Sequence, residues 1–295
     1  MAEITAAQVK ELRERTGVGM MECKKALLAT QGDMTLAIEE LRKSGRAKAD
    51  KKAGRVAAEG IVMIQTAGND AVMVEINTET DFAARDASFL EFANAVINTA
   101  VAEKVDDVAK FMTLPLAGHP NLTVEEARQA LVAKIGENIH LRRIAIIRTQ
   151  GGSVGTYLHS NRIGVLVALD VDNVDLAKDI AMHVAASKPL VISQEDVPAE
   201  LVAKEKEIYM AQAATSGKPQ DILEKMVNGK LKKYLDEISL LGQPFIKDPE
   251  VMVSNLLGKN RAKVVSFTRF EVGEGIEKET EDFVEAVMAQ VHGES

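Results

Sequence analysis

The side chains that could do chemistry in this 295-residue chain are few and scattered. Its five histidines have neither the i, i+4 spacing nor the H-E-x-x-H pattern of a zinc site. Its single cysteine, Cys23, excludes an intrachain disulfide and a cysteine-based metal cluster. No phosphate-binding loop of the G-x-x-x-x-G-K-S/T type occurs, and the glycines at 151–155 favour a turn over a nucleophile elbow. We therefore expect a protein that is not an enzyme and has no metal or cofactor.

Cys23 and His183 each lie on the apolar side of an expected helix. A thiol flanked by Met20 and Leu27 is more often a buried structural group than a nucleophile. For the same reason, a core or interface histidine is favoured over a ligand or base at position 183.

Two short segments carry residue types that suit protein binding. Met20 and Met21 are adjacent at a helix start, so they cannot share a face, and one can point away from the core. An exposed methionine suits an adaptable binding surface, although both could be partly buried in a small bundle. In the second segment, Phe82 follows a strand and stands beside the carboxylate of Asp81. A loop on a rigid scaffold often carries function, but the residue pattern alone favours Phe82 as a core plug.

Residues 46–58 carry five basic residues and one acid, with almost no large apolar side chains. Such a stretch could contact RNA, but it has no interleaved aromatics for base stacking, and the whole chain carries a net charge of −8. A solvated helix or a linker between domains is the favoured interpretation.

The elements expected before this stretch are three short helices. Thr5 and Gln8 have capping-box spacing, and Gly17 ends the first helix. The second runs over about 19–31, with Met20, Cys23 and Leu27 on one side. The third begins after the cap Asp33 and closes at Gly45.

A different pattern begins at residue 59. Strands are expected at 60–65 and 71–76, joined by a turn at 68–70, and Asp86 caps the helix that follows. Residues 105–122, with two prolines and a glycine, indicate an irregular insertion. A capping box at Thr123 and Glu126 opens another helix, which leads to a strand over 141–147.

The order strand, strand, helix then repeats. Strands at 153–158 and 164–169 precede a helix with Leu176, Ile180, His183 and Val184 on one face, which suggests two similar α+β subdomains. Residues 199–241 change to helical period and predict a hairpin of coiled-coil type. Because such a hairpin buries little alone, its apolar stripe needs a partner, which is another part of the chain or a second protein. A strand at 263–270 and a helix over about 278–290 finish the chain.

Several of these segments together resemble the elongation factor Ts family. The N-terminal match is Ile4-Thr-Ala6, Val9–Gly17, Gly19-Met-Met-x-Cys-Lys-Lys-Ala-Leu27 and Gly32-Asp33, and the second is Glu75–Phe82. Further matches are 133–138, 180–186, 242–245 and 269–276. They cover almost the whole chain in collinear order.

The resemblance implies an α+β architecture with an N-terminal domain of ubiquitin-associated type. The implied parts are a three-helix N-terminal domain at 1–45, a basic linker at 46–58, core subdomain N at 59–148, core subdomain C at 149–198 and 242–275, the inserted helical hairpin at 199–241 and a C-terminal helical module at 276–295.

The resemblance also implies a partner, the GTPase elongation factor Tu, and a role as its guanine nucleotide exchange factor. In the family, a Thr-Asp-Phe segment enters the nucleotide domain of that GTPase and displaces its magnesium ion. The matching residues here are Thr80, Asp81, Phe82 and Ala83. This chain departs from the family at the fourth position, which is commonly Val, and 105–122 looks longer than usual.

Further contacts are implied at the N-terminus and in the core. The N-terminal helix pair docks on the same domain of the GTPase, which makes Arg13, Met20, Met21 and Lys24 candidate contacts, and His183 is a candidate in the core.

The sequence further predicts a cytoplasmic protein. The N-terminus lacks a secretory signal, and no apolar run approaches the roughly 20 residues that span a bilayer, so we expect no membrane contact and no stable binding to nucleic acid. Two readings of other classes stay open: an RNA-binding or ribosome-associated factor that uses residues 46–58, and an α/β enzyme.

Overall fold

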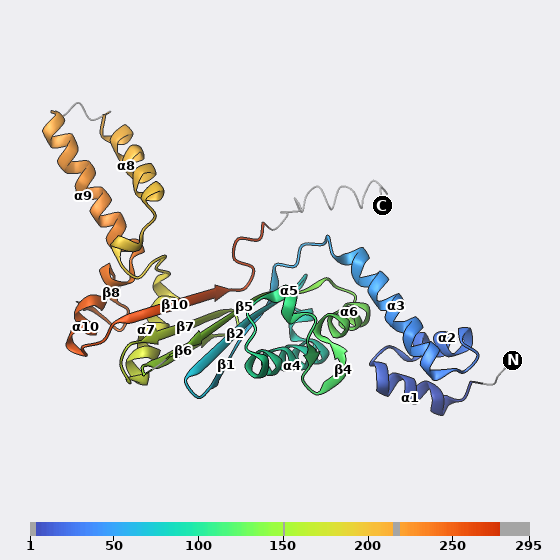
Figure 1. Ribbon diagram of the computed structural model, residues 1–295. Coiled ribbons are helices and arrows are strands. Elements are labelled where there is room, and N and C mark those ends of the chain that lie inside the picture. Colours follow the sequence, from blue (N-terminus) through green and yellow to red (C-terminus); the bar gives the residue numbers. More distant parts are fainter. Residues whose placement is uncertain (1–3, 150, 215–218, 278–295) are drawn as a thin grey trace. The chain divides into compact units, whose positions relative to one another are not determined.

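The structure is a computed structural model that describes residues 4–149, 151–214 and 219–277 (Figure 1). The chain divides into two compact units. The first comprises Met1–Met63, Val74–Ile144 and Glu271–Ser295, and the second comprises Ile64–Met73 and Ala145–Phe270. Both combine helices with small sheets, so the predicted α+β class is confirmed.

The first unit begins with three helices: α1 (Ala6–Thr16), α2 (Met20–Ala29) and α3 (Met34–Lys52). The predicted caps are present. Thr5 and Gln8 form a capping box, Gly17 ends α1 in the left-handed conformation, and Asp33 caps α3. The three helices share a small core: Val9, Leu12, Cys23, Ala26, Leu27, Ala37 and Leu41.

The third helix does not end at Gly45, as the sequence predicted. It continues to Lys52 and takes up half of the basic stretch. Gly45 is buried, and a Cβ built on it would lie 3.9 Å from the Cβ of Ala133 on helix α6 (Val124–Ile135). This glycine therefore lies inside the helix, facing α6, and does not end it.

A three-stranded sheet of order β1-β2-β5 follows. Its strands, β1 (Glu59–Ala67), β2 (Asp70–Thr78) and β5 (Ile139–Arg148), confirm the predicted hairpin and the later strand. The central strand β2 is buried from Ala71 to Thr78. Helix α4 (Ala87–Glu103), capped by Asp86 as predicted, buries an apolar stripe of Phe89, Phe92, Ala93, Val96, Ile97 and Ala100.

The second unit repeats this arrangement with β6 (Ser153–His159), β7 (Ile163–Leu169) and β10 (Val264–Glu271) in the order β10-β7-β6. Strands β6 and β7 are antiparallel, with Ser153 opposite Leu169. Helix α7 (Val174–Ser187) closes the core, which contains Leu169, Ile180, Val184, Leu240 and Val253 among others.

Residues 105–122 are more regular than the sequence predicted. They contain α5 (Val108–Phe111), β3 (Pro115–Leu116) and most of β4 (His119–Thr123), ahead of α6. The second unit contains the same short two-stranded hairpin, formed by β8 (Pro244–Phe245) and β9 (Asp248–Met252), before α10 (Val253–Lys259). Pro115 pairs with Thr123 as Pro244 pairs with Met252. The stretch therefore contains one of two copies of the same short hairpin and is not an irregular insertion.

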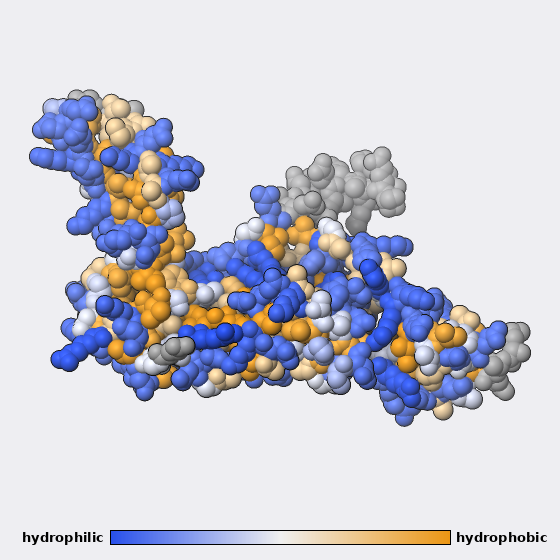
Figure 2. Space-filling model, viewed as in Figure 1, coloured by the Kyte–Doolittle hydropathy of each residue, from blue (hydrophilic) through white to orange (hydrophobic). Residues whose placement is uncertain are grey.

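Helices α8 (Ala199–Ala214) and α9 (Gln220–Ile238) form the predicted helical hairpin of the second unit. They lie side by side and extend away from its sheet (Figure 1). Hydrophobic side chains gather between the two helices and at their base, with hydrophilic ones outside (Figure 2). Across the described part of this pair only Ala213 and Val227 are buried, so the packing between the helices is thin.

The remaining elements are short. Three 3₁₀ turns occur at η1 (Ala83–Arg85), η2 (Gln194–Asp196) and η3 (Leu240–Gly242). Of the helices in the described ranges, none combines the length and apolar character needed to cross a membrane. The helix predicted over 278–290 lies outside the described residues, as does the connection at 215–218 within the predicted hairpin.

Candidate partner-binding site

Phe82 stands on the surface with 80% of its area exposed. The residue pattern alone favoured a core plug, and this interpretation was wrong. The interior position is taken by the next two residues, Ala83 and Ala84, which are 5% and 7% exposed. Because small side chains fill the space beneath the turn η1, the aromatic ring that precedes them remains in solvent.

The backbone around Phe82 is held by several hydrogen bonds. The amide of Ala83 donates to the hydroxyl of Thr80 at 3.2 Å, and the amide of Ala84 donates to the Thr80 carbonyl at 3.3 Å. The amide of Arg85 donates to the carbonyl of Phe82 at 3.1 Å. We name residues 80–83 the Phe82 loop. It offers a large apolar side chain on a fixed backbone.

A glutamate from a distant part of the sequence fastens this loop. The carboxylate of Glu137 accepts hydrogen bonds from the Thr80 amide at 2.9 Å, the Thr80 hydroxyl at 2.7 Å and the Thr78 hydroxyl at 3.0 Å. Sequence reasoning missed this contact, because Thr80 and Glu137 are 57 positions apart and neither spacing nor periodicity connects them. The segment 133–138 entered the family resemblance, but that signal did not indicate what Glu137 contacts.

Asp81 precedes Phe82 in the loop and is partly exposed. Its carboxylate pairs with Arg85 at 2.9 Å, and the Arg85 side chain is largely exposed. An exposed pair one helical turn apart contributes little to stability, so Asp81 is available to exchange this partner for another.

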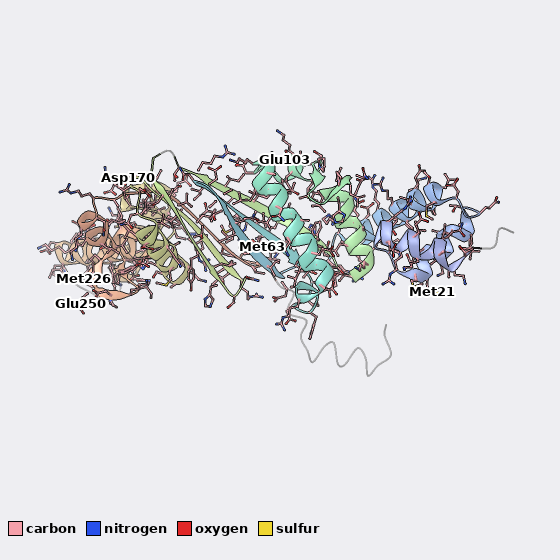
Figure 3. All side chains as sticks on the ribbon, turned by 90° about the horizontal axis from the view of Figure 1, so that it is seen from below. Met21, Met63, Glu103, Asp170, Met226 and Glu250 are labelled. Atoms are coloured by element: carbon pink, nitrogen blue, oxygen red, sulfur yellow. The ribbon has the colours of Figure 1, made fainter. Side chains whose placement is uncertain are left out.

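A second apolar surface lies on the N-terminal helices. Met20 and Met21 are 49% and 68% exposed, and Met21 lies at the outer surface of the three-helix group (Figure 3). The expectation that Met20 packs beside Cys23 and Leu27 was therefore wrong. Cys23 and Leu27 fill the core, while both methionines face solvent.

Other exposed residues extend this surface. Arg13 and Lys24, the other two candidate contacts at the N-terminus, are exposed, and so is Leu28, with 53% of its area in solvent. Leu28 was missed by sequence reasoning, although its spacing of four from Lys24 and eight from Met20 places all three on one helix face. We name Met20, Met21, Lys24 and Leu28 the methionine surface.

His183 and Cys23 are both fully buried, as the apolar helix faces predicted. One ring nitrogen of His183 lies 2.9 Å from the side-chain oxygen of Gln243, and the other accepts the amide of Ile246 at 3.1 Å. Burial lowers the pKa of His183, while the hydrogen bond to Gln243 opposes that shift. Burial raises the pKa of the Cys23 thiol, because it disfavours the charged form there as well. The ring of His183 thus holds the hairpin β8–β9 against α7.

Three of the basic residues of 46–58 contact other segments of the first unit. Lys48 pairs with Glu22 at 2.6 Å, and Arg55 pairs with Glu79 at 3.6 Å. The ammonium group of Lys52 donates to the carbonyl of Gly136. These contacts fit the solvated-helix interpretation of the stretch and give no observation that favours RNA binding.

The exposed residues of these two surfaces are suited to recognising another protein by apolar contact. The Phe82 loop and the methionine surface present a rigid aromatic and an adaptable thioether pair, the residue types enriched at binding surfaces. Within residues 4–149, 151–214 and 219–277, no group of three or more His, Cys, Asp or Glu side chains could hold a metal ion.

Comparison with known proteins gives concordant results. Residues 79–274 match the family model described as elongation factor TS. The chain is 57% identical over 293 residues to elongation factor Ts of Legionella pneumophila (strain Paris), covering 99% of each chain. It is 57% identical over 288 residues to that of Idiomarina loihiensis, covering 98% and 97%, and 53% identical over 293 residues to that of Francisella tularensis subsp. novicida, covering 99% and 100%.

Proposed function

The chain belongs to the elongation factor Ts family, the nucleotide exchange factors for elongation factor Tu, and we propose that its Phe82 loop drives the release of GDP from that GTPase. The protein acts in translation elongation as an exchange factor and not as a catalytic enzyme. The observation that carries the proposal is an aromatic ring, 80% exposed, on a backbone fixed by hydrogen bonds.

The mechanism acts on the magnesium ion that the GTPase holds with its nucleotide. In such enzymes Mg²⁺ bridges phosphate oxygens and a hydroxyl of the phosphate-binding loop, so it anchors the nucleotide electrostatically. The ring of Phe82 enters a neighbouring apolar pocket and shifts the groups that hold the ion. Asp81 gives up its exposed pair with Arg85 and competes for hydrogen bonds at the same place.

The methionine surface supplies the anchor. Met20 and Met21 dock the three-helix domain at 1–45 on the nucleotide domain of the GTPase, with Arg13 and Lys24 beside them. His183 contributes from the interior, by holding the amide of Ile246 and so the exposed side chains of Ile246 and Lys247 in place.

The repeated order of elements supports two related core subdomains, at 59–148 and at 149–198 with 242–275. The basic stretch 46–58 joins them to the N-terminal domain, and the C-terminal module expected at 276–295 lies almost entirely outside the described residues. Exposed Ile208, Met210 and Ile222 on the hairpin at 199–241 support a homodimer contact through this coiled coil. We place the activity in the cytoplasm, where translation elongation occurs.

The energetic rule of exchange is reciprocity. If the chain weakens GDP binding by some factor, GDP weakens binding of the chain by the same factor. Both binary complexes can then turn over, and GTP, the more abundant nucleotide in cells, fills the vacated site.

Stopped-flow release of a fluorescent GDP from elongation factor Tu tests the role of the ring. We expect Phe82→Ala to fold normally and to lower the maximal release rate by about 10–100-fold, because an apolar wedge of this size contributes about 1.5–3 kcal/mol where it is buried. Leu190→Ala is the matched control, since Leu190 is also exposed, at 63%, but lies outside the Phe82 loop. Unchanged acceleration by the Phe82 variant would remove the ring from the mechanism.

A further inference from the structure

We propose that Glu137 is the positioning residue of the Phe82 loop, an inference that rests on the proposed function of that loop. Its carboxylate does not touch the ring of Phe82. It accepts three hydrogen bonds from the two threonines ahead of the ring, and through them sets the direction in which the ring leaves the surface.

The need for such a residue follows from the exposure of the ring. A side chain that is 80% exposed has few neighbours to hold it, so its orientation depends on the backbone that carries it. A mobile loop would lose its conformational freedom on binding, and that cost would reduce the energy left to displace the magnesium ligands. A loop already fixed in the free chain avoids this cost.

Glu137 acts on the loop through a short relay. The hydroxyl of Thr80 donates to the carboxylate at 2.7 Å and accepts the amide of Ala83 at 3.2 Å. The hydroxyl therefore cannot rotate freely, and the amide directly after Phe82 is held by the same contact. Hydrogen bonds to an ionised group are about twice as strong as neutral ones, which suits a loop whose aromatic side chain is not packed against its own domain.

The backbone that carries the carboxylate of Glu137 is itself held in place. Gly136 ends helix α6 in the left-handed conformation, with φ of 92°. The amide of Asn138 donates to Glu79 at 2.6 Å, and the side-chain amide of Asn138, fully buried, donates to the carbonyl of Arg55 at 2.7 Å. The turn at 136–138 is thus tied to the segment after α3 on one side and to the Phe82 loop on the other.

The variant Glu137→Gln tests the inference because it keeps the shape and removes the charge. We expect the maximal rate of GDP release from elongation factor Tu to fall about tenfold, with the half-saturating concentration little changed, since hydrogen bonds to a charged group contribute on this order. Glu125→Gln is the matched control. Its carboxylate also accepts three hydrogen bonds, from Arg128 and Gln129, but none from the loop.

A spectroscopic readout separates positioning from a general loss of stability. The chain contains no tryptophan, so Phe82→Trp supplies a single reporter on the ring position. In the free protein, time-resolved anisotropy should show a slow, restrained indole, and Glu137→Gln in this background should add a fast local motion. An equally restrained indole in both proteins would overturn the inference.

Two further variants keep the outcomes distinct. Thr80→Val removes the donor from the other side of the same contact and should reproduce the loss in rate, which decides the matter if Glu137→Gln does not fold. In a Phe82→Ala background, Glu137→Gln should cause no further loss. If Phe82→Ala slows release while Glu137→Gln and Thr80→Val do not, the positioning role is wrong and the proposed function stands; if Phe82→Ala has no effect, the proposed function itself fails.

Discussion

At the scale of single residues, Phe82 and Glu75 show opposite uses of burial. Leaving a phenylalanine in solvent forgoes about 1.5–3 kcal/mol of hydrophobic stabilisation, which a partner can recover when it covers the ring. Glu75 is a carboxylate with no exposed area, a placement that is costly unless the charge is well paired. Both residues depart from what side-chain polarity alone predicts.

The buried carboxylate of Glu75, on β2, is paired by contacts that come from β5 and from the chain after β10. Its carboxylate accepts the amide of Gly273 at 2.9 Å and ion pairs with Arg142 and Arg143. Burial disfavours the charged form of Glu75, but the Gly273 amide and Arg143 more than offset this and lower its pKa.

The lowered pKa gives a prediction about acid stability. The ionised carboxylate of Glu75 contributes fully to the stability of the fold above the ordinary pKa of 4.5. This stability is lost as the pH falls through the lower pKa of Glu75 in the folded state. Glu75→Gln should reduce the free energy of unfolding of the protein by about 2–3 kcal/mol at pH 7, and the difference from wild type should shrink below about pH 4.5. Urea denaturation monitored by circular dichroism at several pH values measures both effects.

The control for this prediction is Glu91→Gln on the exposed face of α4. It should change the stability by less than about 0.5 kcal/mol at every pH. A Glu75 variant that is as stable as wild type at pH 7, or whose deficit persists unchanged in acid, would contradict the network described above.

Sequence reasoning at this scale succeeded where local chemistry decides the outcome. The caps Thr5, Asp33 and Asp86 act within three residues, so their spacing predicted them. The exposure of Phe82 could not be predicted from its own neighbourhood, since it depends on Ala83 and Ala84 filling the interior and on a carboxylate 57 positions away.

At the scale of elements, two glycines show how helices and strands come close. Gly45 on α3 faces α6 with room for a methyl group, since the nearest atoms to an added Cβ are 3.9 Å away. Gly155 on β6 has no such room, because an added Cβ would lie 2.1 Å from the backbone of Ala177 on α7. The first contact tolerates a small side chain, and the second does not.

Alanine at the two positions should therefore have opposite effects. Gly45→Ala should raise the melting temperature by about 2–4 °C, because alanine in a helix is about 1 kcal/mol more favourable than glycine. Gly155→Ala should lower it by more than that, since β6 must move away from α7. Differential scanning calorimetry of the two variants checks both signs. A loss of stability in Gly45→Ala would contradict the conclusion that there is room for a methyl group between α3 and α6.

Element boundaries were predicted less well than element types. A glycine near the end of a helical pattern suggests termination, so α3 was expected to stop at Gly45, but the helix continues to Lys52 with Gly45 buried inside it. Residues 105–122 looked irregular because β3 and β4 are too short to show a period. Only the matching hairpin before α10 reveals them as an element.

At the scale of the whole molecule, the proposed function assigns different roles to two surfaces. We propose that the methionine surface provides apolar contact that is the same whatever nucleotide the partner holds, and that the Phe82 loop acts where the magnesium ion is held. Only an interaction that differs between the two nucleotide states can change the affinity for GDP. On this proposal the methionine surface sets the affinity for the GTPase, and the Phe82 loop sets the coupling to the nucleotide.

Calorimetric titration of elongation factor Tu with and without bound GDP measures this coupling most directly. For wild type, GDP should weaken the complex strongly. Met20→Ala with Met21→Ala should weaken both complexes by about 1–3 kcal/mol and leave their ratio unchanged, as expected for anchor residues. Phe82→Ala should bring the ratio of the two affinities close to one. A ratio that stays at the wild-type value in the Phe82 variant would contradict the assignment of exchange to the Phe82 loop.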